Sequence, residues 1–93
     1  DGPNGEANMM HALEITVQQR PEVLERVLRV TRHRGFKVTQ MQVRINDDTS
    51  MAVDLWVEAE RAIELLSTQL DKLIDVMHCK VLPAVSLDQA ANS

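Results

Sequence analysis

The sequence predicts an α+β domain in which two helices cover one face of a four-stranded antiparallel sheet. The apolar pattern alternates between a period of two and a helical period, in the order strand, helix, strand, strand, helix, strand. A turn cluster, "NDDTS", separates the second strand from the third. Strand–helix–strand crossovers are right-handed, so these elements predict the ferredoxin-like βαββαβ arrangement.

The first strand is predicted over 12–18, where Leu13, Ile15 and Val17 alternate with polar residues. A helix follows from Pro21, because the missing N–H of proline is not needed at a first helical position. Gly35 is a suitable left-handed stop after this helix. The buried face of the helix is predicted to contain Val23, Leu24, Val27, Leu28 and Thr31.

The second and third strands are predicted over 36–45 and 51–59, with a hairpin between them. The apolar side of the second strand shifts between Val38 and Met41, which predicts a bulge near Thr39 and Gln40. In the third strand, Trp56 falls on the polar side.

The second helix is predicted from about Glu60 to Asp75, and the last strand from Val76 to Leu82, where Pro83 stops it. The helix has an apolar stripe that we expect to be buried, consisting of Ile63, Leu66, Leu70, Leu73 and Ile74.

One domain is expected over 10–84. Residues 1–9 are rich in Gly, Asn and charge, and are predicted to be a disordered segment or a remnant that is not native, with a natural start at Met9 or Met10. Residues 85–93 are predicted to be a flexible tail. A chain of 93 residues has a small core, so support from a partner subunit is expected.

The net charge of −4 argues against non-specific nucleic-acid binding, which needs a basic surface. Cys79 is the only cysteine, so no disulfide can form within the chain. No signal peptide or long apolar span is evident, and a cytoplasmic location away from membranes is expected.

The pattern disfavours several functions that this fold can host. A lone Cys79 does not provide the paired cysteines of a metal chaperone, and the first strand lacks aromatic residues that could stack RNA bases. The turn after that strand has no glycine-rich phosphate cradle. His11, His33 and His78 are far apart in sequence, so we expect neither a catalytic nor a metal-binding cluster.

Two stretches resemble one family. "LERVLRVTRHRGFKV" (24–38) and "STQLDKLIDV" (67–76) resemble the ACT domain of the small regulatory subunit of acetolactate synthase. In the first, the similarity lies in Leu24, Arg26 and Val27 and in the Arg-Gly-Phe stop at 34–36. In the second it consists of Gln69, Leu70, Lys72, Leu73, Ile74, Asp75 and Val76. The resemblance covers about residues 10–82, and the short chain fits the single-domain, isozyme II type.

This resemblance implies an accessory chain that is not itself an enzyme and that docks on and activates a large catalytic subunit in branched-chain amino acid biosynthesis. It implies thiamine diphosphate, magnesium and FAD for the large subunit, and no cofactor for this chain. It also implies a homodimer formed through ACT domains.

ACT domains bind an amino-acid effector at the turn after the first strand, and here that turn departs from the family. The family has a glycine and an asparagine in this turn, and both are absent here. The family has another asparagine just after the glycine–aromatic stop, where this chain has Lys37. Proline removes an N–H donor, a glutamate repels a carboxylate, and a valine adds bulk. We therefore expect a degenerate site with weak or absent valine feedback. The turn consists of Gln19, Arg20, Pro21, Glu22 and Val23.

Two surfaces are candidates for partner contact. Arg26, Arg29 and His33 follow one side of the first helix, where they either contact an acidic patch or form a solvated face. Trp56 either marks a contact on the open sheet face or is a lone exposed aromatic. The alternative functions are a free-standing ACT amino-acid sensor and a small enzyme of the same fold.

Overall fold

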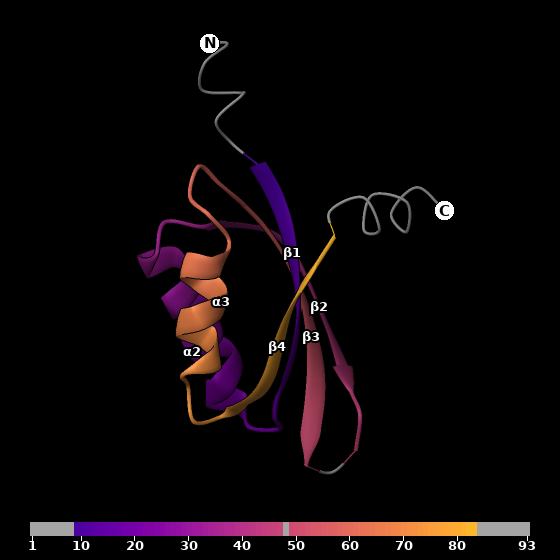
Figure 1. Ribbon diagram of the computed structural model, residues 1–93. Helices are drawn as coiled ribbons and strands as arrows, with labels where there is room; N and C mark the ends of the chain where they lie inside the picture. Colours follow the sequence, from indigo (N-terminus) through magenta and orange to yellow (C-terminus); the bar gives the residue numbers. More distant parts are fainter. Residues whose placement is uncertain (1–8, 48, 84–93) are drawn as a thin grey trace, which may run out of the picture.

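The computed structural model describes residues 9–47 and 49–83. The sheet has the strand order β2-β3-β1-β4, with all neighbouring pairs antiparallel. Both helices lie on one side of it (Figure 1). The predicted ferredoxin-like fold is therefore confirmed. The elements are β1 (Met9–Gln18), α2 (Pro21–His33), β2 (Lys37–Ile45), β3 (Ser50–Ala59), α3 (Glu64–Asp71) and β4 (Val76–Leu82).

The predicted terminal segments are largely outside the part of the chain that the structure describes. Residues 1–8 and the whole predicted tail, 85–93, are outside it. Met9, the last residue of the predicted N-terminal segment, already pairs with Ala59 in the sheet.

The core lies between the helices and the two central strands. Leu13, Ile15 and Val17 of β1 are fully buried on the helical side, and each pairs with an apolar residue of β3. From α2, Val23 and Val27 pack against them. The alternation in the sequence predicted this face because successive side chains of a strand point to opposite sides.

The irregular points of β2 and its neighbours have local causes. The pairing of β2 with β3 shifts between Val38 and Gln40, as the parity change predicted. Gly35 follows α2 with a φ of +87°, a conformation that favours glycine. In the hairpin, the carboxylate of Asp47 accepts hydrogen bonds from the N–H groups of Thr49 and Ser50, and these bonds lower the pKa of Asp47.

The predicted second helix is too long at both ends, because α3 spans only Glu64–Asp71. After Asp71 the chain tightens, with the N–H of Leu73 donating to Leu70 and that of Val76 to Leu73. Ile74, predicted to be buried, is 90% exposed. The stripe prediction is wrong there because the turn into β4 places Asp75, rather than Ile74, against the rest of the domain.

Candidate functional site

Most backbone N–H groups of the turn between β1 and α2 donate hydrogen bonds within the chain. The N–H of Gln19 donates to Thr49 O at 3.0 Å, and that of Arg20 to Gln18 O at 2.9 Å. The N–H of Val23 donates to Arg20 O at 3.2 Å, and Pro21 has no N–H. Three of the four N–H groups over 19–23 are thus used within the chain, which leaves only that of Glu22 outside these bonds.

The side chains of this turn do not converge on one point. Gln19 and Arg20 line a hollow of about 350 Å³ together with Met77. Pro21 and Glu22 line a different, shallow surface along α2. Val23 is only 1% exposed and packs in the core, as predicted for the buried face of the helix. Its steric effect on an effector stays a prediction.

Lys37 lies at the opposite end of the sheet from this turn. Gln18 pairs with Ser50 at one end of β3, whereas Lys37 pairs with Glu58 near the other. Eight residues at about 3.3 Å each separate these points by roughly 26 Å. A single chain therefore cannot bring Lys37 to the turn formed by residues 19–23.

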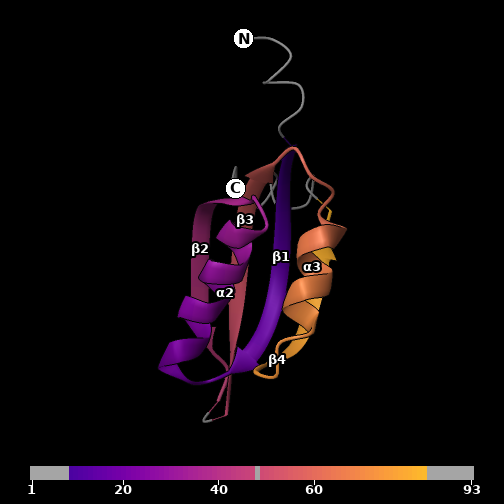
Figure 2. The same ribbon diagram turned by 90° about the vertical axis from the view of Figure 1, so that its left-hand side faces the viewer.

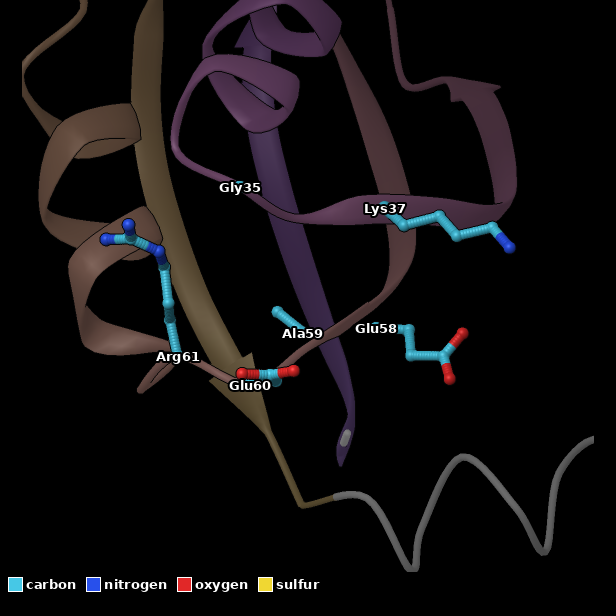
Figure 3. Close-up of a pocket in the computed structure, with 6 residues that line it drawn as sticks. All are labelled: Gly35, Lys37, Glu58, Ala59, Glu60 and Arg61. Carbon is cyan, nitrogen blue, oxygen red and sulfur yellow. The ribbon is translucent and has the colours of Figure 1, made fainter. Parts of the chain in front are cut away.

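Lys37 lines a hollow of about 390 Å³ (Figure 3). Lys37 and Glu58 extend to one side of it, and Arg61 extends toward Gly35 on the other. A methyl group at Gly35 would lie 3.1 Å from Arg61 Nε, so this arginine packs closely over the glycine. The lining carries charges of both signs, which gives it no clear preference for an anion or a cation.

The two sequence stretches that carry the family resemblance meet between α2 and α3. Arg26 of α2 forms an ion pair with Asp75, whose side chain is only 11% exposed. Arg34 donates a hydrogen bond to Gln69 Oε1 at 3.0 Å. Gln69 and Asp75, which the family resemblance includes, therefore join the two stretches through polar contacts.

The candidate contact residues fall on two separate surfaces. Arg29 and His33 line one groove between the helices, which are seen side by side in Figure 2. Arg26 forms an ion pair with Asp75 and does not line this groove. Trp56 is half-buried on the open side of the sheet, paired with Ala12 and Gln40. The helical residues and Trp56 therefore lie on opposite faces of the sheet.

Sequence reasoning identified Lys72 only through the family resemblance and not as a candidate for partner contact. Lys72 follows α3 directly and lines the groove between the helices with Arg29 and His33. Lys72 lies far from Arg29 in the sequence, and only the fold brings the two together. No local pattern could have revealed this.

The described residues contain no metal-binding group of three or more His, Cys, Asp or Glu side chains. The histidines lie on three elements, His11 on β1, His33 on α2 and His78 on β4. Burial raises the pKa of Cys79 to about 11, with Asp71 adding to the shift, so its thiol is a poor nucleophile near neutral pH. Neither helix in the described part is long and apolar enough to cross a membrane.

Comparison with known proteins gives the family. The ACT domain family matches residues 19–79. The small subunit of acetolactate synthase isozyme 2 from Escherichia coli (strain K12) is 39% identical over 82 residues, covering 87% of this chain and 94% of that one. The protein of the same description from Shigella flexneri matches with the same figures.

Solved structures agree on the fold. The ACT domain of a GTP pyrophosphokinase from Chlorobium tepidum superimposes with a TM-score of 0.67, covering 81% of this chain and 99% of that one at 13% identity. A homoserine dehydrogenase from Thiobacillus denitrificans gives 0.60 over 81% of this chain and 16% of that enzyme, at 18% identity. At these identities the likeness concerns the fold alone.

Proposed function

This chain belongs to the ACT-domain family and, within it, to the small subunits of acetolactate synthase of the isozyme 2 type, and from this premise we propose that it docks on and activates a large catalytic subunit. It is a regulatory, accessory chain of a branched-chain amino acid biosynthetic enzyme in the cytoplasm. The observation that carries the proposal is the 39% identity over 94% of the length of the Escherichia coli small subunit.

Catalysis takes place in the large subunit. That partner would use thiamine diphosphate, magnesium and FAD, and this chain contributes no ligand to them. Its described residues provide neither a metal-binding group nor a glycine-rich phosphate cradle. Docking acts by ordering the partner's active site, since a catalytic group held in position accelerates a reaction by removing the entropy of alignment.

Valine feedback on this chain is weak or absent. Pro21 supplies no N–H, and the N–H groups of Gln19, Arg20 and Val23 are already used. Glu22 adds a negative charge in the first turn of α2, where a carboxylate effector would need a positive one. Two like charges at about 4 Å repel by about 1 kcal/mol in water.

The exposed edge of the sheet supports a homodimer. The strand β2 is an unpaired edge with Val43 39% exposed and Ile45 59% exposed. Antiparallel pairing of β2 with β2 of a second copy would cover these side chains and extend the sheet. It would also carry Lys37 of one copy to the end of the sheet where the other copy has residues 19–23.

Complex formation and calorimetry test this proposal together. We expect this chain to co-elute with the holo large subunit in size-exclusion chromatography, and valine to give no heat at micromolar concentration. If the chain stays separate from the large subunit and binds valine with micromolar affinity, the protein is the alternative, a free-standing amino-acid-sensing ACT module.

A further inference from the structure

The groove between α2 and α3 combines an apolar floor with a basic rim. Its volume is about 430 Å³. Val30 and Leu73 are partly buried and pack against the core, so they form the floor. Arg29 and His33 from α2 and Lys72 after α3 are exposed at the rim.

Among the described residues, no acidic side chain forms an ion pair with the basic residues of this rim. The ion pairs formed within residues 9–47 and 49–83 use Arg26 and Arg44, and none uses Arg29, His33 or Lys72. The chain as a whole has a net charge of −4. The lining of the groove includes Arg29, Arg34 and Lys72 and no acidic residue. Its local charge is therefore positive, which favours an acidic partner.

The groove is held in one shape by contacts across the helix pair. The ion pair from Arg26 to Asp75 and the hydrogen bond from Arg34 to Gln69 join α2 to the α3 side. A pre-formed site binds with less loss of conformational entropy than one that must be ordered. The groove also lies on the helical layer, which edge-to-edge pairing of sheets would leave uncovered (Figure 2).

We propose that this groove is the docking site for an acidic segment of the large catalytic subunit. The carboxylates of that segment lie over Arg29, His33 and Lys72, and an apolar side chain of the segment contacts Val30 and Leu73. This inference rests on the proposed function and deepens it by naming the surface and the chemistry of the partner segment.

The test compares two double variants with the same change in charge. The first, Arg29→Glu with Lys72→Glu, reverses the rim. The second, Arg32→Glu with Lys80→Glu, reverses one exposed residue of α2 that does not line the groove and one on the open sheet face. Circular dichroism first establishes that both variants fold.

Affinity for the holo large subunit is then measured by calorimetry at two salt concentrations. We expect the rim variant to bind roughly tenfold to a hundredfold more weakly than wild type, and the control to bind within about threefold of it. Wild-type affinity falls with salt because screening weakens exposed charge pairs, and the rim variant loses most of that dependence.

The outcomes separate this inference from the proposed function. If the wild type binds the large subunit and both variants bind it as tightly as the wild type does, the groove is not the docking site. The proposed function then still stands. If only the control variant binds weakly, the docking surface includes Arg32 or Lys80 rather than the groove, and the inference is overturned. If wild type itself does not bind the large subunit, the proposed function fails first. Binding of inorganic phosphate at micromolar concentration, lost in the rim variant while large-subunit binding is kept, would assign the groove to a small anion.

Discussion

Replacing Arg26 with alanine should destabilise the domain more than replacing Asp75, although both changes break the same ion pair. The side chain of Asp75 is 11% exposed and that of Arg26 is 40% exposed. Without Arg26, a nearly buried carboxylate loses the charge that compensates its desolvation. Without Asp75, the guanidinium can move into water.

The magnitudes follow from this difference in exposure. Removing one partner of a fully buried ion pair costs about 3–5 kcal/mol. Because water reaches Arg26, we expect a loss of about 2–3 kcal/mol for Arg26→Ala and about 1 kcal/mol for Asp75→Ala. The double variant should be less destabilised than the sum, by about 1–2 kcal/mol, because the second change removes an interaction that is already lost.

Urea unfolding measures these free energies, followed by circular dichroism and by fluorescence of the single tryptophan, Trp56. The matched control is Arg29→Ala, an exposed arginine one turn further along α2 without an ion pair among the described residues, which should change stability by no more than about 0.5 kcal/mol. The reasoning is refuted if Arg26→Ala and Arg29→Ala cost the same, or if the two changes at the ion pair are additive.

Three further results follow from the fold. Gly35→Ala should lose about 1–2 kcal/mol in urea unfolding because φ is +87° there and the added methyl group approaches Arg61 Nε; equal stability would contradict this. Leu70→Ala should lower the free energy of unfolding by about 2–5 kcal/mol, because Leu70 is 0% exposed. Ile74→Ala should lower it by less than about 0.5 kcal/mol, because Ile74 is 90% exposed. The reverse order would show that the chain turns differently after α3. Burial raises the pKa of Cys79 from an ordinary value of 9.0 to about 11, so the thiol stays protonated at pH 8. Iodoacetamide should therefore alkylate the folded chain about a hundredfold more slowly than the urea-unfolded chain. Equal rates would show that the thiol is exposed to water in the folded chain.

The sheet could be predicted closely because its periodicity is local. Residues that alternate along β1 and β3 point to opposite faces, and a change of parity can be realigned only by an extra residue. The bulge between Val38 and Gln40 therefore followed from the letters alone. The bounds of β4 were also correct, since Pro83 cannot donate to a ladder.

The second helix could not be bounded in this way, because contacts distant in sequence decide where it ends. Helical periodicity continues through Ile74, but the carbonyl of Asp75 accepts the N–H of Gln18 at 2.9 Å and its carboxylate pairs with Arg26. These contacts fix the turn at the end of α3 and expose Ile74. Propensity and pattern do not contain this information.

The candidate sites were predicted less well than the fold for the same reason. The loss of an N–H at Pro21 could be read from the sequence, whereas the use of the neighbouring donors by Thr49 O and Gln18 O could not. The burial of Val23 was predicted from the helical pattern, whereas its effect on an effector in the turn stays a prediction. The basic groove joins Arg29 to Lys72 only because the fold places the two helices side by side.

The central claim, that this chain activates a larger catalytic partner, is tested most directly by the turnover of that partner. The rate of acetolactate formation by purified holo large subunit would be measured while this chain is titrated in. We expect the rate per large subunit to rise to a plateau at a fixed molar ratio, and valine to leave the plateau unchanged. A rate that stays at its starting value at every concentration of the chain would contradict the account.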